Sequence, residues 1–311
     1  MILPANHSNI LKAAQLIQSG EVVAFPTETV YGLGANAYDS KAIAKIFAVK
    51  NRPTFNPLIS HIAEIDFLKE YAQTDERVLA LAQKFWPGPL TFILNRKDNK
   101  PALDLACAGL DKIAVRMPNH PVALDFIKAC GLPIVAPSAN KSQTISPTTA
   151  QHVYKSLGDL VPAILDAGPC HVGVESTILD MTHDKVVVLR AGGLSAEAVE
   201  EFLGEKVLFS DGNPNKPSSP GQLLKHYAPK YTTRINVSNP QDDEFFIGFG
   251  PMECDLNLSP SADLQEAAAN LFLMMHQAES QSNKTKIAIA PIPNIDLGRA
   301  INDRIKRASY Q

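Results

Sequence analysis

Residues 22–34 read VVAFPTETVYGLG, an apolar run followed by a polar loop. The apolar run at 22–25 is bounded by Gly20 and Pro26, a pattern typical of a short buried strand. The polar residues at 27–29 follow at the end of that strand, where their hydroxyl groups could form a turn or face a ligand. The segment therefore predicts a buried strand that ends in a polar loop.

Residues 32–37, GLGANA, imitate the glycine-rich loop that binds dinucleotides. In that motif the first glycine follows its strand at once, whereas here six residues separate it from Phe25. No acidic residue stands on a predicted strand about twenty positions later. We therefore expect the two glycines to permit positive φ angles in a loop, and we reject a dinucleotide site.

Helical and strand patterns alternate on both sides of this segment. Apolar periodicity predicts helices around 10–17, 42–47 and 78–85, with Asp39 or Ser40 and then Asp75 as N-caps of the last two. Short apolar runs predict strands at 22–25, 91–94, 113–116, 134–136, 163–165, 176–179 and 186–189. This pattern indicates an α/β domain with a large, twisted mixed sheet.

A change in composition divides the chain. Residues 211–230 are rich in Pro, Ser, Asn, Gly and Lys and lack periodicity, which predicts a linker between domains at 1–210 and 231–311. Strands at 245–249 and 286–290, with helices at 263–278 and 298–308, predict that the second domain is a small, doubly wound α/β (Rossmann-like) unit.

Bulk composition narrows the class of protein. The chain has 311 residues, of which 45% are hydrophobic and 20% charged, with a net charge of -3, values typical of a globular protein in solution. It has no basic run that would give a protein-wide nucleic-acid surface, no apolar stretch of the roughly 20 residues that cross a bilayer, and no signal-peptide pattern. Four scattered cysteines indicate reduced thiols, so we expect a cytoplasmic protein without a zinc site.

Two separated polar motifs carry the candidate chemistry. One is Lys50-Asn51-Arg52, and the other is Ser138-Ala139-Asn140. Side chains two residues apart on an extended segment point the same way, so the two motifs would form one four-residue cluster if the fold joins them. Two cations, a hydroxyl and an amide suit the charge and the oxygens of a polyphosphate. Two unrelated surface turns are the alternative, because short motifs often match by chance.

Arg116 ends the apolar run at 113–115. A cation at the end of a buried strand needs an anionic partner, which could be an internal Asp or Glu or the carboxylate of a substrate. His61 ends another short run, where a lone histidine could be structural or could bind a ligand.

Taken together, these motifs resemble the YrdC-like family of threonylcarbamoyl-AMP synthases. The resemblance covers essentially the whole chain. Further motifs that carry it are SPTT at 146–149, GVESTI at 173–178, LRAG at 189–192, PG at 220–221, HYAP at 226–229, PIPN at 291–294 and AINDR at 300–304. Those from 220 onward are similar to the long form of the family, which has an added C-terminal domain. Residues 190–192 read Arg-Ala-Gly where the family more usually has Arg-Pro-Gly, so this turn is less stiff.

The resemblance implies two groups of site residues. For ATP it implies Lys50, Arg52, Asn56, Lys112, Ser138, Asn140, Ser146 and Arg190, with Lys50, Arg52, Ser138 and Asn140 as the catalytic cluster. For L-threonine it implies Thr29, His61, Arg116, Ser176 and the backbone of Ala136. Lys112 stands where the family is expected to have a small polar residue.

The implied reaction joins L-threonine, bicarbonate (or CO2) and ATP into threonylcarbamoyl-AMP and pyrophosphate. Such a step depends on placement and on charge stabilisation at the phosphates, with little covalent help from the protein. Mg²⁺ would bridge the phosphates without ligands from protein side chains. The product would pass to a separate tRNA threonylcarbamoyl transferase, while direct tRNA binding by this chain is left open.

We also expect the linker to fold over the mouth of the first domain and Tyr227 to contact bound nucleotide. An adenylate hydrolyses easily, so a cover that excludes water would protect it; a passive tether is the alternative. Two other functions stay open. One is a non-catalytic RNA-binding module, and the other is carbamoyl transfer through carbamoyl-adenylate. Larger proteins that do the latter carry acylphosphatase and zinc-finger segments with no counterpart in this sequence.

Overall fold

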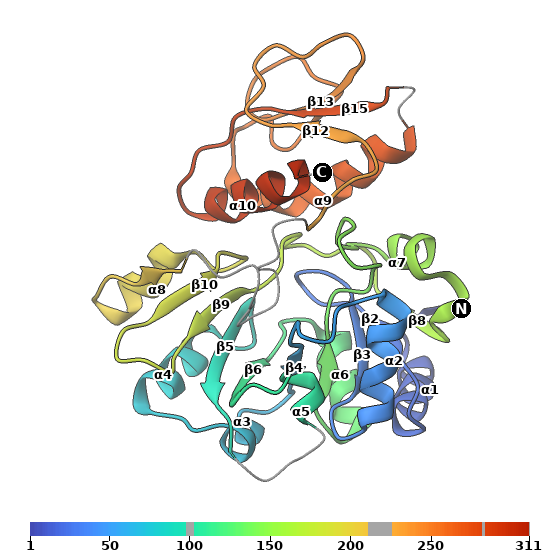
Figure 1. Ribbon diagram of the computed structural model, residues 1–311, viewed down its shortest axis with the longest axis vertical. Helices are drawn as coiled ribbons and strands as arrows, with labels where there is room; N and C mark the ends of the chain where they lie inside the picture. The colour runs from blue at the N-terminus through green and yellow to red at the C-terminus, as the bar shows by residue number, and fades with distance from the viewer. Residues whose placement is uncertain (98–102, 211–225, 282–283, 311) are drawn as a thin grey trace.

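The computed structural model consists of two stacked parts, each built on its own sheet (Figure 1). It describes residues 1–97, 103–210, 226–281 and 284–310. Within those ranges, no helix combines the length and the apolar character needed to cross a membrane. Cys107, Cys130, Cys170 and Cys254 are free thiols.

The larger sheet is mixed and has eleven strands in the order β1-β8-β2-β3-β7-β4-β6-β5-β9-β10-β11. Their bounds are β1 (Ile2–Pro4), β2 (Val23–Phe25), β3 (Gly32–Asn36), β4 (Ile59–His61), β5 (Leu90–Asn95), β6 (Lys112–Arg116), β7 (Ile134–Ala136), β8 (Ala163–Asp166), β9 (Thr177–Asp180), β10 (Val187–Arg190) and β11 (Leu208–Phe209). Every strand predicted in this part is present, within one residue of its predicted bounds. The prediction of an α/β fold with a large mixed sheet is therefore confirmed.

Helices cover both faces of the larger sheet. They are α1 (His7–Gln18), α2 (Ser40–Lys50), α3 (Asp66–Tyr71), α4 (Glu76–Phe85), α5 (Leu103–Ala106), α6 (Pro121–Cys130), α7 (Ala150–Leu157) and α8 (Ala196–Leu203). The apolar residues of α1 and α6 pack on one face of the sheet, and those of α2, α4 and α7 pack on the other. The side chains of Asp39 and Asp75 cap α2 and α4, as predicted.

Gly32 and Gly34 lie in strand β3, where the sequence predicts a loop. Neither has a positive φ angle. A Cβ atom at Gly34 would lie 2.7 Å from Ile134 Cγ2 and 3.0 Å from the ring of Phe25. The loop prediction was wrong because these glycines allow close packing against neighbouring strands, a requirement that no local pattern reveals.

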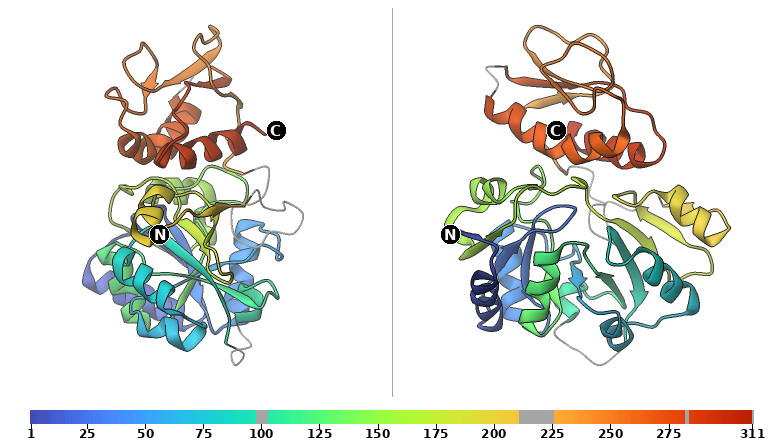
Figure 2. Two further views of the ribbon diagram at one scale, coloured as in Figure 1. Left: turned by 90° about the vertical axis from the view of Figure 1, so that its left-hand side faces the viewer. Right: turned by 180° about the vertical axis from the view of Figure 1, so that it is seen from behind.

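The smaller sheet is parallel, with strands in the order β12-β15-β13-β14. Its elements are β12 (Thr232–Arg234), β13 (Glu244–Gly248), β14 (Leu256–Asn257), α9 (Leu264–Gln281), β15 (Lys286–Ile289) and α10 (Leu297–Ser309). Figures 1 and 2 show α9 and α10 together on the face that points toward the larger part. The described helices thus cover one face of the smaller sheet, whereas a doubly wound sheet has helices on both faces. They lie on this face because the pair also packs on the larger part.

Apolar contacts join the two parts. Val30, Ile145 and Val174 of the larger part share a buried cluster with residues of α9, which include Leu271, Phe272 and Met275. Gly173 has a φ of +74°, and a Cβ atom there would lie 2.4 Å from the carbonyl oxygen of Ala268 in α9. The backbone of α9 therefore rests directly on the loop between β8 and β9.

Candidate active site

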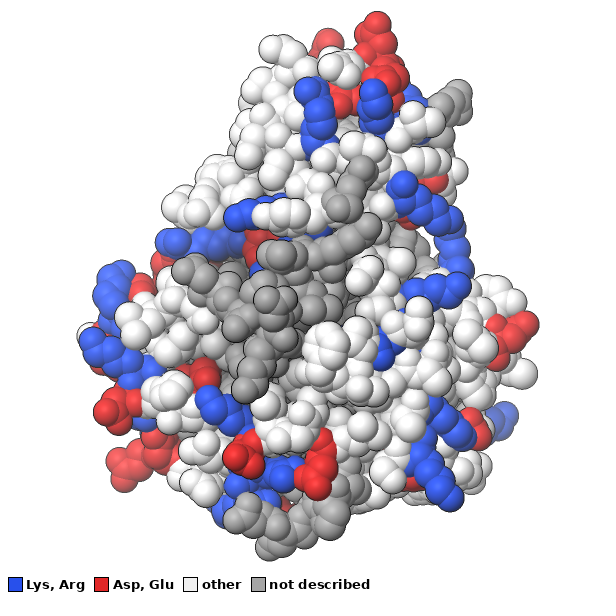
Figure 3. Space-filling model, in the orientation of Figure 1, with Lys and Arg blue, Asp and Glu red and all other residues white. Residues whose placement is uncertain are grey.

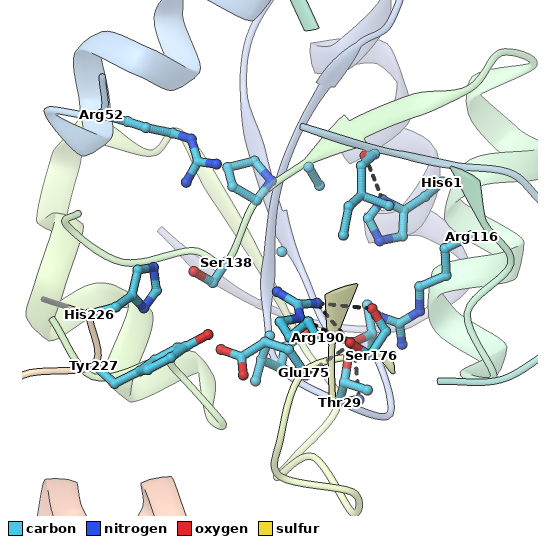
Figure 4. Close-up of a pocket in the computed structure, with 16 residues that line it drawn as sticks. Thr29, Arg52, His61, Arg116, Ser138, Glu175, Ser176, Arg190, His226 and Tyr227 are labelled. Atoms are coloured by element: carbon cyan, nitrogen blue, oxygen red, sulfur yellow. Dashed lines mark hydrogen bonds between the residues drawn. The ribbon is translucent and has the colours of Figure 1, made fainter. Parts of the chain in front are cut away.

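A small cavity opens beside the ends of strands β4, β6 and β7, beneath the smaller part (Figure 4). Its free volume is about 50 Å³, whereas sites for drug-sized ligands measure about 300–1,000 Å³. It is lined by Thr27, Thr29, Val30, Gly32, Arg52, Ile59, His61, Arg116, Ala136, Pro137, Ser138, Glu175, Ser176, Arg190, His226 and Tyr227. Most of the residues predicted for the site therefore meet here, drawn from segments far apart in the sequence.

Arg52 is a buried cation at one end of the cavity. Its Nε donates to the carbonyl of Asn56 at 3.3 Å, and its Nη2 donates to that of Pro57 at 2.9 Å. Burial, assisted by the charge of Arg190, lowers the pKa of Arg52 to about 10. In the part of the chain that the structure describes, no carboxylate forms an ion pair with Arg52, so its charge is left for an anion from outside.

Lys50 takes a different position from the one expected. It is the last residue of helix α2, which ends at Asn51 in the left-handed conformation with a φ of 51°. The prediction of an extended segment that aligns Lys50 with Arg52 was therefore wrong. The Lys50 ammonium is buried and donates to the carbonyls of Ser138 and Asn140, each at 2.5 Å. Lys50 thus joins the two polar motifs from behind the cavity wall. This contact excludes the alternative that the two motifs are unrelated surface turns.

The remaining polar residues at this end support one another. Ser138 lines the cavity and donates to Asn140 Oδ1 at 2.6 Å, while the amide of Asn140 donates to the carbonyls of Thr144 and Ile145. Asn140 therefore shapes the loop behind the cavity wall. Asn56 is also behind the wall, and its buried Oδ1 has no hydrogen-bond partner among the described residues.

Arg116 lies at the other end of the cavity with an internal partner. Its Nη2 is 2.7 Å from Oε1 of Glu28, and the two side chains are only 4% and 1% exposed. The contact is an ion pair without the geometry of a directed hydrogen bond, and neither carboxylate oxygen of Glu28 accepts one from the described residues. Of the two partners expected for Arg116, the internal acid is thus present, although the guanidinium still faces the cavity.

His61 lies beside Arg116, because β4 and β6 are parallel neighbours that pair these two residues in register. Its Nδ1 is 3.1 Å from the carbonyl oxygen of Ile59. Burial and then the charge of Arg116 lower the pKa of His61 to about 3, so the ring is neutral near pH 7. A neutral imidazole can exchange hydrogen bonds with a small polar ligand without adding charge.

The two ends of the cavity meet at Ser176. Its hydroxyl is 2.7 Å from that of Thr91, and Arg190 donates to its carbonyl from Nε at 3.1 Å and from Nη2 at 2.9 Å. Thr29 lies nearby, with its hydroxyl 2.8 Å from that of Thr27. Residues assigned to threonine and to ATP are therefore in direct contact.

Lys112 lies on the same face of β6 as Arg116 but four residues earlier, a distance of about 13 Å along a strand. It does not line the cavity, and its ammonium is 2.9 Å from Oδ2 of Asp180. The structure does not bring Lys112 to the other predicted residues.

Glu175 lines the cavity, and the predicted site did not include it. Its Oε1 accepts from Ser146 Oγ at 2.6 Å, which places Ser146 behind the wall, and its Oε2 is 2.9 Å from Nε of Arg304. Burial would raise the pKa of Glu175, but the charges of Arg304 and then Arg190 lower it to about 2. The GVESTI motif contained this residue, but nothing in its local pattern indicated a partner in the C-terminal part.

His226 and Tyr227 close the cavity on the side of Arg52 and Ser138 (Figure 4). The Tyr227 ring is buried, 3.9 Å from the ring of His226 and 5.4 Å from that of Phe272 in α9. Most of the predicted linker, residues 211–225, falls outside the described residues. The expected contact between Tyr227 and nucleotide stays a prediction, now with the side chain placed in the cavity wall.

Comparisons with known proteins agree over nearly the whole chain. Residues 15–192 match the family model of Sua5, YciO and YrdC, described as telomere recombination, and residues 194–309 match the C-terminal domain of threonylcarbamoyl-AMP synthase. The threonylcarbamoyl-AMP synthase of Bacillus subtilis is 39% identical, with 99% of this chain and 94% of that protein covered. A putative threonylcarbamoyl-AMP synthase of Mycobacterium tuberculosis is 38% identical, with 63% of this chain and 89% of that protein covered. The crystal structure of Pyrococcus abyssi Sua5 with L-threonine has a TM-score of 0.90 and 35% identity, covering 99% of this chain and 97% of that chain.

Proposed function

Because this chain belongs to the family of threonylcarbamoyl-AMP synthases, in its long form with the C-terminal domain, we infer that it catalyses the reaction for which that family is named. It joins L-threonine, bicarbonate (or CO2) and ATP into threonylcarbamoyl-AMP and releases pyrophosphate. The family resemblance predicted from the sequence is thereby confirmed.

One observation carries the placement of the substrates: a single cavity has a buried arginine at each end, with different partners. Arg52 has no carboxylate partner among the described residues, which suits the phosphates of ATP. Arg116 faces the cavity beside neutral His61, which suits the carboxylate and the hydroxyl of threonine. Arg190 contacts Ser176 between them and would hold the reacting groups of both substrates close together.

The chemistry follows from this placement. The neutral amine of threonine adds to CO2, which bicarbonate supplies with release of water, and the carbamate forms as the nitrogen loses a proton to solvent. A carbamate oxygen then attacks the α-phosphorus of ATP. The bond from that phosphorus to the bridging oxygen breaks, and pyrophosphate leaves. Arg52, Arg190 and the hydroxyl of Ser138 would stabilise the charge that develops on the phosphate oxygens. No nucleophilic side chain is needed, since the carbamate itself attacks.

Mg²⁺ enters this scheme as part of the nucleotide substrate. In the described ranges, no group of three or more His, Cys, Asp or Glu side chains is placed to hold a metal ion. The cations and hydroxyls of the cavity suit phosphate oxygens, and the phosphates would carry the magnesium ion with them.

The product is a mixed anhydride, which a separate transferase would consume by placing the threonylcarbamoyl group on an adenosine of tRNA. On the face shown in Figure 3, Lys and Arg side chains are interspersed with Asp and Glu. Such mixed charge favours handing the adenylate to the transferase over a stable complex between this chain and tRNA. The cytoplasm, where reduced thiols and tRNA are found, is the compartment that we propose.

The test is pyrophosphate release from ATP with threonine and bicarbonate supplied separately and together. We expect release only when both are present. Release that needs neither would overturn the mechanism, and salt-sensitive tRNA binding without release would favour an RNA-binding module. Release that proceeds when other amines replace threonine would favour carbamoyl transfer.

A further inference from the structure

Arg304 is a charged residue of helix α10 whose side chain is 0% exposed. It reaches from the smaller part into the wall of the active-site cavity. Its Nε is 2.9 Å from Oε2 of Glu175, and its Nη1 donates to the carbonyl of Ala191 at 2.7 Å, next to Arg190. Its guanidinium carbon lies 5.5 Å from the centre of the Tyr227 ring. One side chain of the C-terminal part therefore contacts three pieces of the cavity wall.

The contact with Glu175 matters because of where this carboxylate lies. Glu175 lines the cavity between Tyr227 and Arg190 (Figure 4), and its low pKa keeps it negatively charged. A negative charge beside a polyphosphate repels it, and the repulsion is strong where water is excluded. Arg304 supplies a compensating charge from behind the wall, and Asp303 balances it in turn with an oxygen 2.9 Å from Nη1.

We propose that Arg304 is a positioning residue through which the C-terminal helix completes the nucleotide end of the active site. It neutralises Glu175 from behind the cavity wall, so that ATP binding depends on it and threonine binding does not. This inference rests on the proposed function, because it takes the phosphates to bind at Arg52 and Arg190.

A second ion pair from the same helix provides a matched control. Arg299 of α10 lies 2.8 Å from Glu197 of α8, so it also joins the two parts. These side chains are 37% and 42% exposed and do not line the cavity. If Arg304 only fastened the two parts together, removing either arginine would affect the two substrates alike.

The experiment measures KM for ATP and for threonine from pyrophosphate release in Arg304→Gln and Arg299→Gln. In Arg304→Gln we expect KM for ATP to rise about tenfold or more and KM for threonine to stay within about threefold, because Glu175, then balanced by Arg190 alone, opposes the phosphates. In Arg299→Gln both constants should stay within about twofold of wild type, as for an exposed ion pair.

The double variant Glu175→Gln/Arg304→Gln separates charge from packing. It removes both charges, so KM for ATP should return to within about threefold of wild type. If Arg304→Gln alone does not fold, KM for ATP in the double variant still tests the proposal. A double variant with KM for ATP still raised, or an Arg304→Gln variant with equal rises for both substrates, would overturn the inference.

Failure of the proposed function would be distinguishable, because it would show in the wild-type protein as no pyrophosphate release with all three substrates. A readout that does not depend on turnover is the rise in Tm that ATP causes. This rise should be present in wild type and in the double variant and smaller in Arg304→Gln. An equal rise in all three proteins would contradict the role assigned to Arg304.

Discussion

At the end of the cavity that we assign to threonine, Arg116 lies 2.7 Å from the buried carboxylate of Glu28, whereas at the end that we assign to the phosphates Arg52 contacts the carbonyls of Asn56 and Pro57. A guanidinium paired with an acid is neutralised and oriented before any ligand arrives. One that contacts only carbonyls among the described residues has no acidic partner there, which weakens the unliganded fold and favours an incoming anion. Under the proposed assignment, the comparison predicts that the threonine end is preformed and that the phosphates complete the charge balance at the other end.

The largest effect is expected at the phosphate end. Arg52→Ala should lower turnover by at least an order of magnitude, because it removes about 2–4 kcal/mol of stabilisation of the developing phosphate charge. Its free energy of unfolding should stay the same or increase, because the variant loses a buried cation that has no acidic partner among the described residues. Steady-state kinetics and urea unfolding would measure both quantities.

Arg52→Lys is the conservative control for that comparison. It keeps the charge but not the planar fork, so its turnover should lie between those of wild type and Arg52→Ala. Wild-type turnover in Arg52→Ala, with a normal circular dichroism spectrum, would remove Arg52 from the phosphate site.

The second prediction concerns the paired arginine. Arg116→Ala should raise KM for threonine far more than KM for ATP, because the carboxylate of threonine would lose its two-point contact with the guanidinium. Unlike Arg52→Ala, it should also lower stability, by about 3–5 kcal/mol, because Glu28 is left as a buried charge without its partner. Thermal melts with and without threonine, together with both KM values, test this. Proportionate losses for the two substrates would confine Arg116 to a structural role.

The third prediction uses pH to test the neutral histidine beside Arg116. The pKa of His61 is about 3 in the folded protein, compared with about 6.5 in an unfolded chain. Between these values the unfolded state binds more protons. The contribution of His61 to stability is therefore complete above about pH 6.5 and is lost as the pH falls toward 3.

Replacing His61 by Gln should remove this dependence. Near pH 4.5, the slope of unfolding free energy against pH should be lower than in wild type by up to about 1.4 kcal/mol per pH unit. Urea unfolding at a series of pH values measures the slope. Identical slopes in the two proteins would mean that His61 is protonated in the folded state as readily as in the unfolded one.

The smallest effect is expected at Lys112. Its side chain is 30% exposed and paired with that of Asp180, which is only 6% exposed. Because Asp180 keeps its hydrogen bonds from Thr182, Lys112→Ala should lower stability by about 1–2 kcal/mol. KM for ATP should change by less than about threefold, because the ammonium lies outside the cavity. A tenfold rise would show instead that the nucleotide site extends along β6 as far as Lys112.

The sequence predicted most of the strands because each is a short apolar run with clear boundaries, such as the run that contains Val23 and Phe25. Strand β3 was missed because its glycines are required for close packing against the ring of Phe25 and against Ile134. Only the assembled sheet brings these residues near. The direction of Lys50 was missed because one left-handed residue, Asn51, ends α2 beside it.

The candidate site divides in the same way. Arg116 and Ser138 were identified by motifs within the larger part, and the structure places both at the cavity. The partner of Glu175 was not identified from the sequence, because Arg304 lies on a helix 129 positions later in the chain. Periodicity and local spacing cannot reveal a contact of that range, so the contribution of the C-terminal part to the site appears only in three dimensions.

The ion pair between Glu175 and Arg304 also predicts how the sequences of relatives without the C-terminal part should differ. Its two members lie in parts of the chain that match separate family models, so a lineage that lost the C-terminal part would lose the arginine and keep the acid. The Mycobacterium tuberculosis relative matches only 63% of this chain although nearly all of that protein is covered. In such shorter relatives we expect a neutral residue at the position aligned with Glu175, because no arginine from a second domain would balance an acid there.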